Sequence, residues 1–462
     1  MTLVNMAQRI NVLNGSTGER LGELQSRRLT ELVQFARTHS PFYRGLYDGV
    51  PQHVTDPAVL PVTNKAVLME DFDDWSTDRE ITRDAAEAFV SDPEMIGHKF
   101  LGKYLVSTTS GTSGYRGIFL MSEEELAQAG RINLLPQVVD FLKKGIVSGA
   151  ALRLVRGRLR SASIIATGAH HILNSIRLRS SESGRRKGSN RNIVLSVLQP
   201  VSELVRELNA FQPVMLSSYA GIISILASEQ EKGTLSIRPA LVALTGEGLP
   251  TSEYARIERV FGARVIDSYG CSEAITMSRS CEHRWHHILS DWIIVEPVDE
   301  DWRPVPPGTL SHTTLLTVLY RKTQPIIRYD LGDAVLQRPD PCPCGNPNPA
   351  VRVSGRAVDL LRTPDGAAKT SAALVVESLA AKVDGIRQLQ LLQTGPATLE
   401  VRLVPDHRVE SESVWTNTLA VLARLLADNE LEYTLKRGTA PPELSPGGKL
   451  RQFIPAAPSG SG

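Results

Sequence analysis

Apolar residues near the start of the chain recur at the spacing of an amphipathic helix. The positions on one face of this helix are Leu29, Leu32, Val33 and Ala36. Ser40-Pro41, a typical turn sequence, follows them. The pattern predicts a helix that ends near residue 40.

Between residues 190 and 270, short apolar runs alternate with amphipathic segments. The expected strands cover residues 193–197, 214–216, 240–244 and 263–266, and the expected helices cover residues 202–211, 221–230 and 252–261. Strands that alternate with helices in this way indicate βαβ units. We therefore expect a sheet with parallel pairs, covered by helices on both faces.

The pattern changes twice in the rest of the chain. From Ile293 the apolar runs are shorter and separated by Pro/Gly turns, which favours an antiparallel subdomain. After Arg356, residues 389–403 predict strands and residues 414–426 predict an amphipathic helix.

These changes predict an α/β protein with two domains, since 462 residues exceed one ordinary core. The large domain, residues 1–355, is expected to hold mixed or parallel sheets covered by helices and a short β subdomain. The small domain, residues 356–462, is expected to be a mobile α+β unit that begins at a hinge near residues 355–359.

Composition excludes several classes of function. Hydrophobic residues make up 42% and charged residues 22% of the chain, and the formal net charge is +1. This balance leaves no overall field that would attract nucleic acid or an acidic membrane. The sequence shows no apolar run of the ~20 residues that a membrane span needs, no signal-peptide core, and too few cysteines for a disulfide framework. We expect a cytoplasmic protein with small-molecule partners.

The segment from Ser107 to Gly117 (STTSGTSGYRG) is the most informative for function. Its small residues let the backbone approach a ligand, and consecutive N–H groups can form an anion-binding nest. Its hydroxyl groups add donors for phosphate oxygens. It is not a Walker A loop, because no Gly-Lys-Ser/Thr follows. Taken alone, the segment is equally compatible with a plain Ser/Gly turn.

Further motifs follow in order along the chain. TGEG at residues 245–248 and DSYGCSE at residues 267–273 each end an expected strand, where α/β sheets place ligand-binding loops. Then come PIIRYDLGD at residues 325–333, GRAVD at residues 355–359 and GGK at residues 447–449.

This order of motifs resembles the adenylate-forming superfamily of acyl-CoA synthetases and adenylation domains. SPFYR at residues 40–44, LPVTNK at residues 60–65 and PIIRY at residues 325–329 resemble the phenylacetate–CoA ligase-like family in particular. The resemblance covers nearly the whole chain. It implies adenylation of a small acid with ATP and Mg²⁺, CoA as a candidate co-substrate, and homodimers formed through the large domain.

The resemblance also assigns the contacts to ATP. The phosphate loop consists of Ser107, Thr108, Thr109, Ser110, Gly111, Thr112, Ser113 and Gly114. Tyr269 stacks on the adenine, while Gly246 and Glu247 contact its edge. Asp333 accepts hydrogen bonds from the ribose. The other implied contacts are Asp267, Ser268, Gly270 and Ser272.

The implied catalytic residues are Glu273, Arg356 and Lys449. Glu273 holds Mg²⁺, which prefers oxygen ligands. Arg356 lies near the ribose and α-phosphate, and Lys449 swings in with the small domain to contact the acid and the α-phosphate. Without the upstream motifs, Lys449 would be interpreted as a solvated tail residue.

The chain departs from the family at two places. Tyr115-Arg116 stands where the family often has Lys-Pro, and Val358 stands where it usually has a polar hinge residue. These departures leave adenylation as the expectation. They weaken the expectation that the small domain rotates for thioester formation.

A second candidate site consists of Cys281, His287, Cys342 and Cys344. Three thiolates and one imidazole complete a tetrahedral structural zinc site, and Cys342-Pro343-Cys344 forms a tight knuckle. The phenylacetate–CoA ligase-like family has a similar arrangement, which favours His287 over His283 and His286. Unrelated reduced cysteines are the alternative.

The acid pocket is expected between the sheet and the Tyr269 loop. Its candidate lining residues are Gly168, Ala169, His170, Tyr219, Ala220, Thr245 and Cys271. The small residues leave room for a ring, which favours an aryl or arylalkyl acid. His170 is equally compatible with a structural role.

The sequence leaves the acceptor open. CoA is the first hypothesis, and an amine or carrier protein of secondary metabolism is the second. A third is activation of nitrite for N–N bond formation with an arylamine. A nucleotide-binding protein without catalysis is the remaining alternative. Retention of Glu273, Asp333, Arg356 and Lys449 argues against it.

Overall fold

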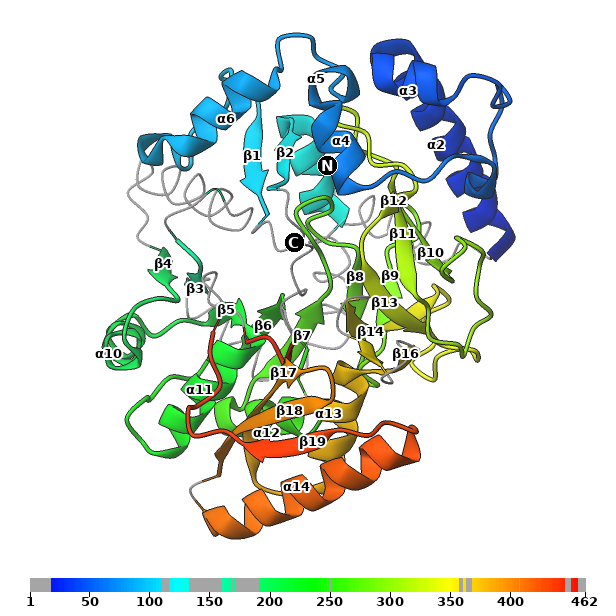
Figure 1. Ribbon diagram of the computed structural model, residues 1–462. Coiled ribbons are helices and arrows are strands. Elements are labelled where there is room, and N and C mark those ends of the chain that lie inside the picture. Colours follow the sequence, from blue (N-terminus) through cyan, green and yellow to red (C-terminus); the bar gives the residue numbers. More distant parts are fainter. Residues whose placement is uncertain are drawn as a thin grey trace.

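The structure is a computed structural model. It describes residues 18–109, 116–132, 160–167, 170, 191–246, 248–249, 251–356, 360–362, 368–406, 408–444 and 450–455. Figure 1 shows a parallel sheet beside a group of antiparallel strands, with the N-terminal helices above and a C-terminal unit below. No helix in these described ranges is long and apolar enough to cross a membrane.

The N-terminal part is helical and ends in a hairpin. The expected helix is α2 (Gly18–His39), which buries the predicted apolar face. Ser40 then caps α3 (Pro41–Leu46), because its Oγ atom accepts the Tyr43 N–H at 3.3 Å. The elements that follow are η1 (Pro57–Val59), α4 (Lys65–Glu70), α5 (Phe72–Trp75), α6 (Arg83–Ser91), η2 (Pro93–Met95), β1 (Leu105–Thr108) and β2 (Ile118–Met121).

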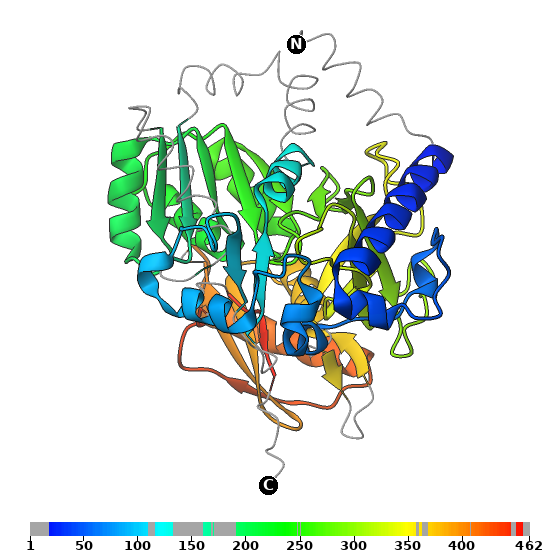
Figure 2. The same ribbon diagram turned by 90° about the horizontal axis from the view of Figure 1, so that it is seen from above.

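A five-stranded parallel sheet follows, which confirms the βαβ prediction. Its strands are β3 (Ser161–Ile165), β4 (Asn192–Ser196), β5 (Met215–Tyr219), β6 (Leu241–Thr245) and β7 (Arg264–Ser268), in the order β4-β3-β5-β6-β7. The associated helices are α10 (Val201–Phe211), α11 (Ala220–Glu231) and α12 (Thr251–Phe261). Figure 2 shows these strands side by side at one end of the molecule. Buried apolar residues of the sheet and helices form one core cluster.

The next region is antiparallel, as the shorter apolar runs predict. Its strands are β8 (Ser278–Ser280), β9 (His286–Ile288), β10 (Ile293–Val298), β11 (Thr313–Val318), β12 (Tyr329–Asp330), β13 (Asp333–Gln337) and β14 (Ala350–Arg356). They form two sheets, in the orders β10-β11-β12 and β13-β14-β9-β8. Their buried residues share a core cluster with the N-terminal helices.

Two motifs that carry the family resemblance contact each other in this region. Thr63 donates its N–H to the Arg328 carbonyl at 3.0 Å and accepts the Asp330 N–H at 2.8 Å. The Arg328 guanidinium donates to the Leu60 carbonyl at 2.6 Å and lies 3.2 Å from the Glu296 carboxylate. Burial raises the pKa of Glu296 to about 6, although Arg328 opposes the shift. The LPVTNK segment is therefore fixed to the PIIRY segment.

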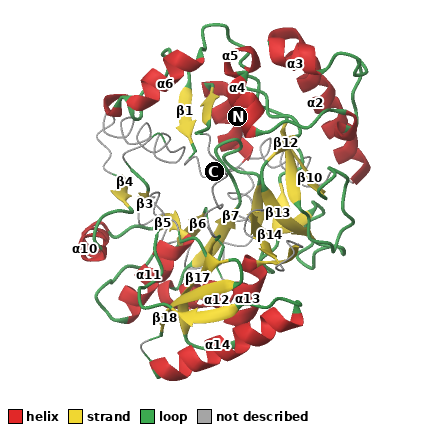
Figure 3. Cartoon of the chain, viewed as in Figure 1, coloured by secondary structure: helices red, strands yellow, loops and turns green. Residues whose placement is uncertain are grey.

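The C-terminal unit has its own core cluster, formed by residues between Leu361 and Phe453. Its elements are β15 (Leu360–Arg362), β16 (Ala368–Ser371), α13 (Ala372–Lys382), β17 (Ile386–Gly395), β18 (Thr398–Pro405), α14 (Ser411–Asp428), β19 (Thr434–Arg437) and β20 (Phe453–Ile454). The sheet order is β19-β18-β17-β20, with an antiparallel central pair and parallel outer pairs. Figure 3 shows α14 on the outer side of this sheet.

A network of charged residues joins the C-terminal unit to α11 and α12. It consists of Glu231, Glu253, Arg256, Arg387, Asp406 and Arg408, and we call it the domain-contact network. Arg387 Nη1 lies 3.2 Å from Glu253 Oε1, and Arg408 Nη2 lies 3.1 Å from Glu231 Oε1. Two acids and one base come from the α11–α12 side, and two bases and one acid from the C-terminal side. The two faces are therefore electrostatically complementary.

Candidate active site

The carboxyl edge of the parallel sheet brings three predicted loops together. Tyr219 ends β5, Thr245 ends β6 and Ser268 ends β7. Tyr219 is the register partner of Thr245, and Thr245 is the register partner of Ser268. Ligands of α/β sheets bind at such an edge. The pocket candidates Tyr219, Ala220 and Thr245 therefore lie beside the ATP candidates Gly246 and Ser268.

The base of the phosphate loop is closed by the β1–β2 hairpin. Thr109 donates its N–H to the Gly117 carbonyl at 3.0 Å, and Gly117 donates its N–H to Thr109 Oγ1 at 3.0 Å. A Cβ atom on Gly117 would lie 2.7 Å from the Phe119 ring, so this close approach requires glycine. Ser110, Gly111, Thr112, Ser113 and Gly114 lie outside the described residues.

The predicted phosphate loop also contacts the predicted acid pocket. Thr108 donates its N–H to the His170 carbonyl at 2.7 Å, and the His170 ring lies against Phe89 with a centroid distance of 5.4 Å. His170 is 1% exposed. Ser107 donates its hydroxyl to the Phe119 carbonyl at 3.4 Å. Gly168 and Ala169 lie outside the described residues.

Two hydrogen bonds between tyrosines and carboxylates connect the DSYGCSE and PIIRYDLGD motifs. Tyr269 donates its hydroxyl to Asp333 Oδ2 at 2.6 Å, and Tyr329 donates its hydroxyl to Glu273 Oε1 at 2.8 Å. Burial raises the pKa of both tyrosines well above the ordinary value, and the adjacent carboxylates raise it further. Both phenols therefore stay protonated and donate.

A tight turn shapes the segment between Tyr269 and Glu273. Cys271 donates its N–H to the Ala274 carbonyl at 2.8 Å. A Cβ atom on Gly270 would lie 2.2 Å from the Ile275 carbonyl oxygen, so the turn excludes any other residue there. Burial raises the pKa of the Cys271 thiol well above its usual value, and the Glu273 carboxylate adds to the shift. Cys271 is therefore a neutral thiol beside Glu273, and Ser272 lies in the same turn.

Asp267 is occupied by protein contacts. Its Oδ2 atom accepts the Tyr254 hydroxyl at 2.6 Å and lies 3.6 Å from His286 Nε2. Burial raises the pKa of Asp267, and the nearby His286 opposes this shift. In these contacts the carboxylate links β7 to α12 and β9. Its contact with ATP stays a prediction.

The motifs nearest the C-terminus converge on the same region. Asp333 and Arg356 are register partners on β13 and β14. Leu444 and Leu450 form an antiparallel bridge, and Gln452 Nε2 donates to the Gly248 carbonyl at 3.4 Å. The segment after GGK therefore contacts TGEG, and the Leu444–Leu450 bridge joins the chain before and after GGK. Lys449 and Glu247 themselves lie outside the described residues.

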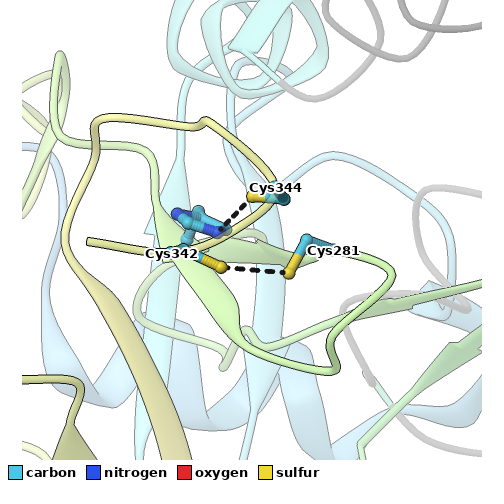
Figure 4. A group of neighbouring side chains, drawn as sticks. Cys281, Cys342 and Cys344 are labelled. Atoms are coloured by element: carbon cyan, nitrogen blue, oxygen red, sulfur yellow. Dashed lines mark hydrogen bonds between the residues drawn. The ribbon is translucent and has the colours of Figure 1, made fainter. Parts of the chain in front are cut away.

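The four predicted metal ligands form a cluster, which we call the Cys₃His cluster (Figure 4). The donor atoms of Cys281, His287, Cys342 and Cys344 all lie within 4.8 Å of one another. Cys281 Sγ lies 3.7 Å from Cys342 Sγ, and Cys344 Sγ lies 3.2 Å from His287 Nε2. A tetrahedral zinc ion with Zn–S bonds of about 2.3 Å places its sulfur ligands about 3.8 Å apart. The spacing of the sulfurs fits such a metal.

The surroundings of the cluster support metal binding. His287 Nδ1 donates to the Asn348 carbonyl at 2.9 Å, which directs Nε2 toward the sulfurs. Burial lowers the pKa of His287, which keeps this imidazole neutral. Trp285 and Ala350 are buried against the cysteines. His286 instead faces Asp267, so it does not compete as a ligand.

The sequence did not identify two of the contacts at this site. Tyr329 belongs to the PIIRY segment, but nothing in the spacing of the motifs predicts that its hydroxyl donates to Glu273. Gln452 carries no sequence signal of its contact to Gly248. Both contacts join segments that are far apart in sequence.

Comparison with known sequences gives one partial match. No family model matches the chain. Phenylacetate–coenzyme A ligase of Thermus thermophilus is 28% identical over 160 residues, which are 33% of this chain. The match therefore spans only about a third (36%) of that relative.

Solved structures match over more of the chain. A 2-hydroxyisobutyryl-CoA ligase in the postadenylation state, with 2-HIB-AMP bound, superposes with a TM-score of 0.66 at 20% identity, covering 95% of this chain and 90% of the ligase. The same ligase in the thioesterification state gives 0.51 at 20% identity, with 96% and 91% covered. An anthranilate CoA ligase in complex with anthranoyl-AMP gives 0.52 at 13% identity, with 75% and 64% covered.

The chain thus matches acyl-CoA ligase structures over most of its length. The matched part includes the parallel sheet, the antiparallel strands and the C-terminal α+β unit. The chain therefore has the fold of these ligases, which agrees with the resemblance to the adenylate-forming superfamily that the motifs predict.

Proposed function

We propose that this chain is an ATP-dependent, AMP-forming ligase that activates a small acid and transfers it to CoA. One observation carries this proposal. Tyr269–Asp333 and Glu273–Tyr329 join two motifs beside the carboxyl edge where Tyr219, Thr245 and Ser268 meet. These contacts support the proposal, because they link the residues expected to bind adenine, ribose and the magnesium ion.

The chemistry required is positioning and charge stabilisation. ATP must be held so that an oxygen of the acid attacks the α-phosphorus in line. In this proposal Asp333 accepts hydrogen bonds from the ribose hydroxyls, and the loop at residues 107–114 binds the β- and γ-phosphates. Arg356 and Lys449 stabilise negative charge at the α-phosphate. The acid occupies the pocket between Tyr219 and Cys271, and we favour an aryl or arylalkyl acid.

Glu273 fits the expected magnesium ligand. Its carboxylate offers hard oxygen donors, and the side chain is buried beside the predicted nucleotide site. When bound, Mg²⁺ neutralises phosphate charge during the transfer. The Cys₃His cluster fits zinc by its donor set and spacing. Its four protein ligands complete the coordination, so we assign it a structural role.

The position of the C-terminal unit supports the adenylation step. We infer two domains, residues 1–355 and 356–462, with the small domain acting as a lid. Gln452 contacts Gly248, and the Leu444–Leu450 bridge joins the chain before and after GGK, which supports a position of Lys449 near the predicted adenine loop. The higher TM-score with the postadenylation state than with the thioesterification state agrees with this orientation.

The acceptor is tested by AMP release with ATP and a panel of aryl, arylalkyl and short aliphatic acids, each with and without CoA. We expect AMP release that depends on one acid and continues only with CoA. Slow AMP release at the same rate with and without CoA would indicate that the acceptor is an amine or a carrier protein instead of CoA. ATP turnover only with nitrite and an arylamine would indicate that the activated acid is nitrite and not a carboxylic acid. ATP binding without AMP formation in any arm would favour the non-catalytic alternative.

A further inference from the structure

Glu273 is a buried carboxylate with one hydrogen-bonding phenol. It is 4% exposed, and Tyr329, which donates to its Oε1 atom at 2.8 Å, is 1% exposed. A buried carboxylate without a partner is costly, so this contact contributes to holding the side chain in place. The Cys271 thiol also lies within hydrogen-bonding reach of this carboxylate. A carboxylate offers about four lone-pair sites, so these two contacts leave capacity for a metal ion.

Tyr329 is well suited to hold Glu273, because three segments fix its own position. It is the register partner of Leu316 on β11, and it forms a parallel bridge with Thr63 of the LPVTNK segment. Its ring meets the Phe119 ring edge-on with a centroid distance of 6.5 Å. Phe119 belongs to β2, the strand that leaves the predicted phosphate loop. The hydroxyl is therefore fixed relative to that loop.

The backbone of Glu273 is restrained from the other side. The turn that begins at Gly270 tolerates no side chain there, since a Cβ would lie 2.2 Å from the Ile275 carbonyl oxygen. The Cys271 N–H closes the turn by donating to the Ala274 carbonyl at 2.8 Å. The turn sets where the side chain begins, and the Tyr329 hydroxyl sets where its carboxylate points.

We propose that Tyr329 is a positioning residue that orients the Glu273 carboxylate toward the magnesium ion of bound ATP. This inference rests on the proposed function, and in particular on Glu273 as the metal ligand. Magnesium requires near-ideal octahedral geometry, so a ligand free to rotate binds it less well. Loss of a partner that orients a metal ligand typically lowers metal affinity by about 10–100-fold.

The test compares Tyr329→Phe with Tyr320→Phe. Tyr320 is a matched control, since it is 6% exposed and its hydroxyl has no hydrogen-bond partner in the described part of the chain. The readout is calorimetric ATP binding over a Mg²⁺ series, with ATP binding in EDTA measured separately. Thermal unfolding of both variants reports whether each is folded.

We expect Tyr329→Phe to raise the Mg²⁺ concentration for half-maximal ATP binding by about 10-fold or more, with ATP affinity in EDTA unchanged. Tyr320→Phe should behave like the parent. An unchanged Mg²⁺ dependence in folded Tyr329→Phe would overturn the positioning role, as would an equal loss of ATP affinity with and without Mg²⁺. A parent that does not bind ATP would overturn the proposed function and this role together.

Combining Glu273→Gln with Tyr329→Phe provides a second test, which does not rest on the Tyr329→Phe variant alone. This change weakens the metal ligand but keeps an oxygen that can accept the Tyr329 hydroxyl. If Tyr329 acts through Glu273, adding Tyr329→Phe to Glu273→Gln should change the Mg²⁺ dependence less than twofold. A further tenfold loss in the double variant would show that the two residues act independently and would contradict the proposal.

Discussion

Arg387 is the residue whose removal most directly tests the domain-contact network. Its guanidinium contacts Glu253 and Asp406, and its side chain is 13% exposed. Glu253 belongs to α12, whereas Arg387 and Asp406 belong to the C-terminal unit. Arg387→Gln keeps a polar side chain of moderate length but removes the charge that links the two faces.

The size of the effect follows from distance and burial. At 3.2 Å and an effective dielectric of about 20, the attraction between Arg387 and Glu253 is about 5 kcal/mol, before the cost of desolvation. Removing one partner of a buried pair costs about 3–5 kcal/mol. Here Glu253 keeps Arg256 and Asp406 keeps Arg408. We therefore expect a loss of about 2–3 kcal/mol in the free energy of docking, below the range for an isolated pair.

Hydrogen exchange measures this loss locally. Glu253 lies on α12 and Arg387 on β17. The protection of the amides in these two elements against exchange therefore reports how often the contact between the two faces opens. Arg402→Gln is the matched control. Arg402 is 14% exposed and pairs with Glu400 and Glu443, all within the C-terminal unit. Arg402→Gln should leave the hydrogen-exchange protection of the α12 amides unchanged.

A double-mutant cycle with Glu253→Gln and Arg387→Gln separates their coupling from other effects. We expect a coupling free energy of about 1–3 kcal/mol. Additivity within about 0.5 kcal/mol, or equal loss of α12 protection in Arg402→Gln, would refute the idea that these charges join the two units.

Three further predictions address other parts of the molecule. Lys449→Ala should lower acid-dependent AMP formation by about 10²–10³-fold, as the loss of one charge-stabilising donor does; AMP formation equal to that of the parent would contradict its catalytic role. Elemental analysis of dialysed protein should find zinc, and Cys344→Ser should reduce it and lower the melting temperature; less than about 0.2 equivalents in the folded parent would refute the zinc assignment, because a closed structural site retains its metal. The raised pKa of Glu296, about 6, means that the folded state holds its proton more tightly than the unfolded state. Between pH 4.5 and 6 the free energy of unfolding should therefore fall with rising pH by roughly 2 kcal/mol from this group. Glu296→Gln should remove that decline, and a decline retained in the variant would contradict the assignment.

Hydrophobic spacing predicted the local elements well, because they depend on residues close in sequence. The helix ending before Ser40 and the alternating elements between residues 190 and 270 are present. The expected strand at 214–216 extends to Tyr219, because the parallel ladder with β6 continues through the polar residues Ser217 and Ser218. The strand Ser161–Ile165 was not predicted, since two of its five residues are serines and its apolar signal is short.

Contacts between distant segments could be predicted only where a family resemblance supplied them. The resemblance places Cys281 and Cys342 in one metal site, and their sulfurs lie 3.7 Å apart. In contrast, Arg387 and Glu253 have no local signal, because a charged residue on an amphipathic element usually faces solvent. Their contact depends on how the C-terminal unit packs against α11 and α12, which spacing within either segment does not encode.

The central claim is that the chain forms an acyl-AMP, and acid-dependent exchange of labelled pyrophosphate into ATP tests it most directly. This exchange requires only reversible adenylation, so it is independent of the acceptor. We predict exchange with at least one acid of the aryl and arylalkyl panel, dependent on Mg²⁺ and lost in Lys449→Ala. Folded protein that binds ATP but gives no exchange with any acid, or that releases ADP instead of AMP, would contradict the claim.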